Sequence, residues 1–162
     1  MKSLSISILV LIFSASCSNI GDKMPEFELK TISGNTITKE ELTGKVVVID
    51  VWATWCVNCM NEINELNTLV EEYKEDQSIV FLAISDENLE TVNRFLSKSA
   101  FLFEHAVNGS ELSKVLQTRA VKTYPQHIIL DPKMRIAYEH SGELSSPLAT
   151  LSAEIDRIIT NE

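Results

Sequence analysis

Apolar residues occupy Val46–Trp52 almost without interruption, and the pattern changes at the cysteines that follow. Asp50 is the one polar residue in this stretch, whose composition is typical of a strand buried on both faces of a sheet. From Cys59 onward the apolar side chains recur at helical spacing, at Ile63, Leu66, Leu69, Val70 and Tyr73. The pattern predicts a strand over 46–52 and a helix over 56–74, with Cys56 and Cys59 on the first helical turn.

The remaining apolar and polar positions predict a succession of short strands and helices. Two segments on either side of a turn cluster, Glu26–Thr31 and Asn35–Thr38, predict a β-hairpin. The other expected strands are Ile79–Ile84, a short one within Phe101–Val107, His127–Leu130 and Arg135–His140. The other expected helices are a turn at Lys39–Leu42, one capped by Asp86 or Asn88, Ser110–Leu116, and one that begins at Ser146-Pro147. This succession predicts a parallel crossover and one α/β/α domain with a mixed sheet.

The first seventeen residues have the pattern of a targeting segment rather than that of a folded element. A basic residue, Lys2, precedes the apolar run Leu4–Phe13, which is too short to span a membrane. Small residues then lead to Cys17, and the segment resembles a bacterial lipoprotein signal peptide whose cleavage leaves Cys17 as a lipid-modified first residue. Ser14 stands where that signal usually has Leu, so plain secretion with cleavage nearby is the alternative.

Length and composition are those of an ordinary globular protein. The chain has 162 residues, of which 44% are hydrophobic and 23% charged, and this suffices for one domain with its own core. The formal net charge of -9 argues against nucleic acid or anionic lipid headgroups as surface partners. We expect a signal peptide over 1–17, a lipid anchor at Cys17, a tether over 18–23 and one domain over 24–162. Such a protein works on the periplasmic or extracytoplasmic side of a bacterial cell envelope.

Cys56 and Cys59 carry the candidate chemistry. The first turn of a helix stabilises an anion, and the pKa of a thiol in a Cys-x-x-Cys motif falls from ~8.5 to somewhere in ~3.5–7.5. Cys56 is the expected exposed nucleophile, and Cys59 on the same helix face is expected to resolve a mixed disulfide. Half of a zinc site, or two structural thiols, are the alternatives. Zinc needs four ligands, and His105, His127 and His140 are scattered along the chain. We therefore expect a redox pair, no metal and no cofactor.

The sequence MPEFELKTISGNTITKEELTGKVVVIDVWATWCVNC, residues 24–59, resembles the opening of thioredoxin-like thiol–disulfide oxidoreductases of the TlpA/ResA type. The resemblance covers nearly the whole chain after residue 23 and extends to the related AhpC/TSA and Redoxin proteins of the thioredoxin superfamily. It implies a thioredoxin-like three-layer α/β/α sandwich with an N-terminal β-hairpin and a central βα insertion. It also implies a membrane-tethered protein-disulfide oxidoreductase, with substrates such as apocytochrome c and a membrane thiol-electron donor of the DsbD/CcdA kind.

The resemblance gives Asp50 a role beside the two cysteines. A carboxylate in an apolar strand is costly unless it has a partner or a task, and burial should raise its pKa. Thioredoxins carry Asp at the position of Asp50, where it accepts the proton of the second cysteine. The resemblance therefore implies that Asp50 is a general base for Cys59, whereas an ion pair between Asp50 and Lys45 is the alternative.

Pro125 occupies the position of the cis-proline that faces the two cysteines in the family. A cis bond at Pro125 would expose the backbone of Tyr124 for pairing with a substrate strand, and a trans proline that leads into a strand is the alternative. Trp55 is expected to shield the sulfur pair and to offer an apolar surface to partners. His127, two residues after Pro125, is interpreted as a packed or hydrogen-bonded strand residue.

The direction of electron flow stays open at this level. Val57-Asn58 stands between the cysteines where relatives usually have Pro before the second one, so we expect a reduction potential anywhere between ~-270 and ~-120 mV. The buried acid and Trp55 favour a reductase over a disulfide oxidase or isomerase.

A copper metallochaperone of the same fold is a further alternative, but such relatives use Cys-x-x-x-Cys. Peroxide-reducing relatives use Pro-x-x-x-Thr-x-x-Cys, which this chain lacks, and no role is assigned to Glu62, Asp86 or Glu87.

Overall fold

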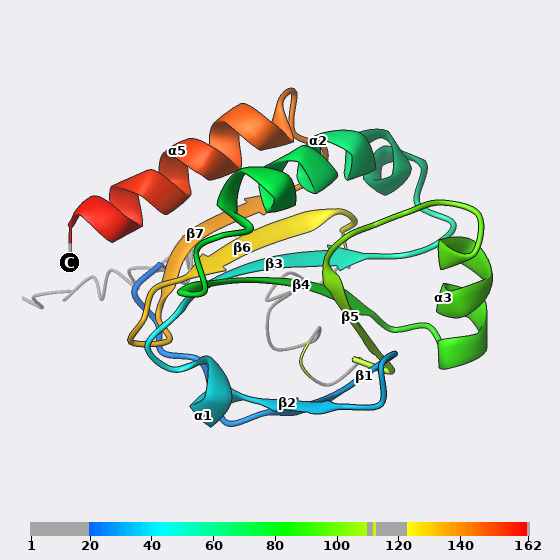
Figure 1. Ribbon diagram of the computed structural model, residues 1–162, viewed down its shortest axis with the longest axis horizontal. Coiled ribbons are helices and arrows are strands. Elements are labelled where there is room, and N and C mark those ends of the chain that lie inside the picture. The colour runs from blue at the N-terminus through cyan, green and yellow to red at the C-terminus, as the bar shows by residue number, and fades with distance from the viewer. Residues whose placement is uncertain (1–19, 110–111, 113–122, 162) are drawn as a thin grey trace, which may run out of the picture.

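A mixed β-sheet forms the centre of the computed structural model, which describes residues 20–109, Leu112 and 123–161 (Figure 1). Among these residues the sheet has seven strands in the order β2-β1-β5-β4-β3-β6-β7. The strands are β1 (Glu28–Thr31), β2 (Thr36–Thr38), β3 (Val46–Trp52), β4 (Ile79–Ser85), β5 (Glu104–Val107), β6 (Gln126–Leu130) and β7 (Ile136–Ser141). β4 runs parallel to β3 and to β5, whereas β6 runs antiparallel to β3, which confirms the predicted mixed sheet with its parallel crossover.

The strand β3, which lies beside β4 at the centre of the sheet, is buried along its whole length, because it is paired on both edges and covered on both faces. Successive side chains of a strand point to opposite faces, and this alternation divides the core in two. Ile49 and Val51 belong to one apolar cluster, and Val48 and Trp52 belong to the other. Asp50 therefore lies on the face of Val48 and Trp52, which is the face that the cysteines cover.

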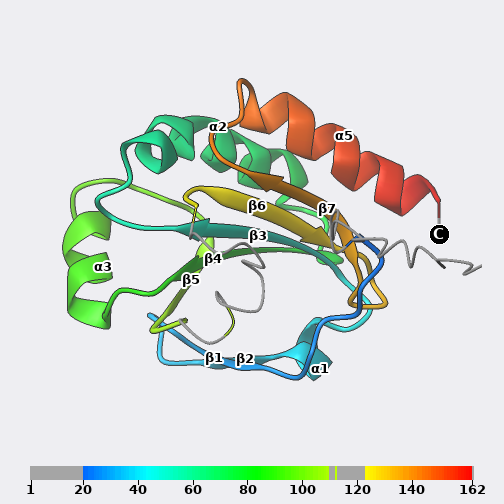
Figure 2. The same ribbon diagram turned by 180° about the vertical axis from the view of Figure 1, so that it is seen from behind.

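Two long helices, α2 (Val57–Tyr73) and α5 (Pro147–Thr160), lie side by side on that face of the sheet (Figures 1 and 2). The apolar stripe of α2 is buried there, as its spacing predicts. Ser146 caps α5 and Pro147 occupies its first turn, which confirms the predicted helix start. The N-terminus of α2 follows directly on the loop after β3, so this junction places both cysteines at the end of the central strand.

The opposite face is covered in part by the β1–β2 hairpin and by the short helix α1 (Lys39–Leu42), which lie below the central strands in Figure 1. The helix α3 (Leu89–Leu96) connects β4 and β5 and is capped by Asn88, one of the two predicted caps. The expected helix Ser110–Leu116 lies outside the described residues except for Leu112. No helix in the described part of the chain combines the length and the apolar character that a membrane crossing requires.

The chain joins the sheet earlier than the sequence predicts. The N–H of Gly21 donates to the Ile136 carbonyl at 2.7 Å, and the N–H of Met24 donates to the Met134 carbonyl at 2.8 Å. Part of the expected tether, residues 21–23, is therefore paired with the segment that leads into β7. The expected signal peptide 1–17 with its lipid-modified cysteine lies outside the described residues.

Candidate active site

A disulfide joins Cys56 and Cys59 at the N-terminus of α2, with an S–S distance of 2.10 Å and a Cα–Cα distance of 5.3 Å. The helix begins at Val57, one residue later than predicted, so Cys56 is its N-cap. Cys56 Sγ accepts the N–H of Cys59 at 3.1 Å and takes the place of the oxygen that usually caps a helix. This sulfur therefore lies at the positive end of the helix dipole, where a negative charge is stabilised.

The disulfide is less exposed than the sequence suggests. Cys56 is only 6% exposed and Cys59 only 2% exposed, so the expectation of an exposed Cys56 is wrong for the oxidised protein. The neighbours of Cys56 project outward instead, and Trp55 is 66% exposed. A surface groove of about 420 Å³ runs past Cys56 between Trp55, Val57 and the Tyr124 side chain. The groove therefore gives access to Cys56, whereas Cys59 is not part of its lining.

Trp55 does not lie isolated on the surface. Its ring meets the ring of Tyr124 edge-on, with a centroid distance of 5.5 Å and an interplanar angle of 88°. The Tyr124–Pro125 peptide bond is cis, in agreement with the expectation, and β6 begins at the next residue. The Tyr124 hydroxyl donates to Asp86 Oδ2 at 3.1 Å. The two loops on either side of Cys56 are thus in contact through these aromatic rings.

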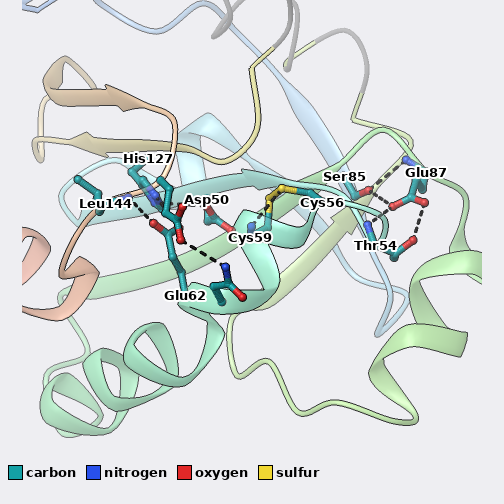
Figure 3. Close-up of a disulfide and its surroundings, with 11 residues drawn as sticks. Asp50, Thr54, Cys56, Cys59, Glu62, Ser85, Glu87, His127 and Leu144 are labelled. Atoms are coloured by element: carbon teal, nitrogen blue, oxygen red, sulfur yellow. Dashed lines mark hydrogen bonds and ion pairs between the residues drawn. A yellow bond between two sulfur atoms is a disulfide. The ribbon is translucent and has the colours of Figure 1, made fainter.

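Asp86 and Glu87 directly follow β4, whose carboxyl end lies next to that of β3, and each holds one of these loops. Figure 3 shows Glu87 with Thr54 and Ser85. Glu87 Oε2 accepts the backbone N–H of Thr54 at 2.6 Å, and Glu87 Oε1 accepts the Thr54 hydroxyl at 2.8 Å. Ser85 closes the arrangement, because its hydroxyl donates to Glu87 Oε2 and accepts the N–H of Glu87. Sequence reasoning assigned neither acid a role at the active site, and the structure gives both a positioning contact.

Three buried ionisable side chains meet behind the disulfide (Figure 3). Asp50 and His127 are direct cross-strand neighbours on β3 and β6, and Asp50 Oδ1 lies 3.3 Å from His127 Nδ1. The other ring nitrogen of His127, Nε2, lies 3.0 Å from Glu62 Oε2 on α2. Glu62 Oε1 in turn accepts the backbone N–H of Leu144. One imidazole thus lies between two carboxylates.

The electrostatics of this cluster follow from its burial. Burial raises the pKa of Asp50 to about 7, although His127 acts to lower it, and the charge of Glu62 raises it further. Burial lowers the pKa of His127, but its contacts with Glu62 and Asp50 outweigh this effect and raise the pKa overall. The expectation that burial raises the Asp50 pKa is confirmed, and the partner of Asp50 is His127 rather than Lys45.

Sequence reasoning found Asp50 but missed the other two members of its cluster, His127 and Glu62. Glu62 falls on the buried stripe of α2, three residues after Cys59 and four before Leu66, which is the signal that could have identified it. His127 lies in a strand whose five residues are all buried, where a polar side chain needs a partner. The interpretation of His127 as a packed strand residue is therefore incomplete, because its ring bridges two carboxylates.

A thioredoxin-like α/β fold with a Cys-x-x-Cys disulfide at the start of a helix defines a thiol–disulfide oxidoreductase, and similar proteins carry that description. The chain belongs to the AhpC/TSA family, whose sequence profile matches residues 20–139. It is 26% identical over 134 residues to the thiol-disulfide oxidoreductase ResA of Halalkalibacterium halodurans. The aligned region covers 82% of this chain and 74% of the relative.

Two further comparisons add a similar sequence and a similar fold. The thioredoxin-like protein YneN of Bacillus subtilis is 26% identical over 138 residues, which is 84% of this chain and 79% of that protein. The crystal structure of a thiol:disulfide interchange protein of the thioredoxin family from Chlorobium tepidum superposes with a TM-score of 0.67 at 20% identity. This superposition covers 85% of the present chain and 93% of the other one, and it supports the thioredoxin-like fold.

Proposed function

We propose that this protein reduces disulfide bonds of other proteins on the extracytoplasmic side of a bacterial membrane, to which a lipid on Cys17 tethers it. The observation that carries the proposal is the position of Cys56 Sγ, which caps α2 and accepts the Cys59 N–H. Once the disulfide is reduced, the same N–H and the helix dipole stabilise Cys56 as a thiolate at neutral pH. A thiolate at the edge of an open groove is the reactive group that attack on a partner disulfide needs.

The reaction has two exchange steps. In the first, the Cys56 thiolate attacks one sulfur of the partner disulfide, a Cys56–partner bond forms, and the other partner sulfur leaves as a thiolate. In the second, Asp50 takes the proton of Cys59, and the Cys59 thiolate attacks Cys56 Sγ. The Cys56–Cys59 bond forms and the partner leaves with both cysteines reduced, so that two electrons pass from this protein to the partner.

The exposed aromatic surface beside Cys56 fits a protein partner. Trp55 and Tyr124 form one wall of the groove, and Val57 is exposed on the other side of Cys56. An extended segment of the partner can lie in this groove and pair with the backbone of Tyr124, in the manner of an added strand. Apocytochrome c is a candidate substrate, and a membrane thiol-electron donor of the DsbD/CcdA kind is the candidate that returns the protein to its dithiol form.

Covalent trapping tests the proposed cycle. We expect Cys59→Ser to accumulate mixed disulfides with its substrates in the cell envelope, because Cys56 can attack but nothing can resolve the product. Cys56→Ser is the matched control and should accumulate far fewer. Absence of mixed disulfides with Cys59→Ser would contradict the proposal, and mass spectrometry of the trapped partners identifies the substrates.

Two measurements test the direction of the reaction and the tether. Equilibration with a glutathione buffer gives the reduction potential, which we expect near that of thioredoxin at ~-270 mV. A value near ~-120 mV would identify a disulfide oxidase instead.

The protein should be recovered in membranes with a lipid on Cys17, and Cys17→Ser should release it. An unlipidated protein in membrane extracts would contradict the anchor.

A further inference from the structure

The attack of Cys56 on a disulfide does not by itself require a buried cluster of two carboxylates and one imidazole. Asp50, Glu62 and His127 are each no more than 3% exposed, so water cannot compensate their charges. Two ionised carboxylates in one buried site repel each other, and their ionisation is stabilised only by a nearby positive charge. The His127 ring lies 3.3 Å from one carboxylate and 3.0 Å from the other, so it supplies that charge when it is protonated.

The cluster is placed where the proton of Cys59 has to go. Glu62 lies one helical turn after Cys59 on the same face of α2, and Asp50 lies on the face of β3 that α2 covers. Figure 3 shows the three side chains grouped beside Cys59, on the side away from the Thr54 and Glu87 pair. The N–H of Leu144 fixes the second oxygen of Glu62, so Glu62 is held from outside the cluster as well.

We propose that His127 is a positioning residue for disulfide exchange, which joins Asp50 and Glu62 into one proton-sharing unit that takes up and returns the proton of Cys59. This inference rests on the proposed function, because it concerns the step in which Cys59 resolves the mixed disulfide. The Asp50 carboxylate accepts the proton of the Cys59 thiol, and the resulting thiolate attacks Cys56 Sγ. The partner sulfur leaves with the electron pair of the broken bond, while the proton stays in the unit until solvent or the departing thiolate takes it.

The ionisable groups that face His127 come from three elements. Asp50 faces it from β3 and Glu62 from α2, where Cys59 lies one turn earlier. His140 faces it from β7, as its register partner, with ring centroids 6.4 Å apart and nearly parallel planes. His127 acts to lower the pKa of Asp50 and the charge of Glu62 acts to raise it, so we expect replacement of His127 to move the pH midpoint up and replacement of Glu62 to move it down.

The experiment isolates the resolving step with a chemical probe. The full chain carries Cys17→Ser, so that Cys56 and Cys59 are its only thiols. The reduced protein is mixed with 5,5′-dithiobis(2-nitrobenzoic acid), and the release of thionitrobenzoate is followed by stopped-flow absorbance. The first equivalent reports attack by Cys56, and the second reports resolution by Cys59. Thionitrobenzoate leaves as the thiolate at all pH values used, so the pH dependence of the second phase belongs to the attacking thiol and its acceptor.

We expect His127→Gln to move the midpoint of the second phase up by about one pH unit or more, and to slow that phase about tenfold at pH 6–7. Glu62→Gln should move the midpoint down. The first phase should change little in either variant. Should His127→Gln fail to fold, the sign of the Glu62→Gln shift still decides the question. Midpoints that stay at the wild-type pH, or that move in the same direction in both variants, would overturn the proposal.

A matched control separates proton sharing from the general effect of removing a buried imidazole. His105 is as deeply buried as His127 but lies on β5 and contacts the Phe101 carbonyl instead of a carboxylate. We expect His105→Gln to leave the midpoint unchanged, and an equal shift in this variant would overturn the proposal. Absence of the first phase in the wild-type protein would refute the proposed function itself, so the two failures are distinguishable.

Discussion

The carboxylate of Glu87 accepts two hydrogen bonds from Thr54, one from the Thr54 backbone N–H and one from the Thr54 hydroxyl. These bonds connect the carboxyl end of β4 to the loop that carries Trp55 and Cys56. Hydrogen bonds to a charged acceptor are stronger than neutral ones, and a third such bond, from the Ser85 hydroxyl, orients the same carboxylate. The loop before the disulfide is therefore held by the residue that follows a neighbouring strand, in addition to its own hydrogen bond from the Cys56 N–H to the Ala53 carbonyl.

Glu87→Gln should weaken this connection. An amide has one acceptor oxygen and no charge, and its NH₂ group would face the N–H or the hydroxyl of Thr54. We expect a loss of ~1–3 kcal/mol in the free energy of unfolding, measured by urea denaturation of the oxidised protein. Glu90→Gln is the matched control, because Glu90 pairs with Arg94 on the surface and its loss should cost less than ~1 kcal/mol. Equal losses in both variants would contradict a positioning contact at Glu87.

A second prediction follows from the raised pKa of Asp50. Its pKa in the folded protein is about 7 and its ordinary value is 3.8, so the folded protein holds this proton more tightly than the unfolded chain does. As the pH rises from 4 to 8, Asp50 ionises in the unfolded chain before it ionises in the folded protein. The free energy of unfolding of the wild-type protein therefore falls over this range. Residue 50 cannot ionise in Asp50→Asn. The free energy of unfolding of this variant, minus that of the wild type, should therefore increase by roughly 2–4 kcal/mol from pH 4 to pH 8.

The measurement is a series of urea denaturation curves on the oxidised proteins, in which the cysteines do not titrate. Glu75→Gln, which changes an exposed carboxylate at the end of α2, is the control and should show no such increase. A difference between Asp50→Asn and wild type that is independent of pH would show that Asp50 ionises at its ordinary pKa in the folded protein.

The central strand, the main helix and the disulfide could be predicted because each has a local signal. The apolar run of β3 fits only a doubly buried strand, and Asp50 is conspicuous as the one polar residue in it. The roles of His127 and Glu62 could not be predicted in the same way. Each is a single polar residue without a pattern of its own, and their contacts form only when β3, β6 and α2 come together.

A third prediction concerns the exposed aromatic wall of the groove. Trp55→Ala removes the edge-on contact with Tyr124 and a large exposed apolar side chain beside Cys56. An aromatic contact contributes ~0.5–1.5 kcal/mol, so we expect the rate constant with a disulfide-bonded protein to fall about three- to tenfold. The loss should be smaller with a small-molecule disulfide, which buries less of the wall. Leu102→Ala, which removes an exposed apolar side chain outside the lining of the groove, is the control for surface apolarity in general.

The pairing of the N-terminal segment with the strand β7 leads to the last prediction. Met24 is almost completely buried in the core cluster below the sheet, and its N–H donates to the Met134 carbonyl. Met24→Ala leaves a cavity in this cluster and should lower the free energy of unfolding by roughly 2–4 kcal/mol. Ile20, four residues earlier, is half exposed, and Ile20→Ala should change that free energy by less than about 0.5 kcal/mol. Urea denaturation of both variants checks this contrast. If Met24→Ala were as harmless as Ile20→Ala, the segment 21–24 would behave as a tether, and the folded domain would begin only after it.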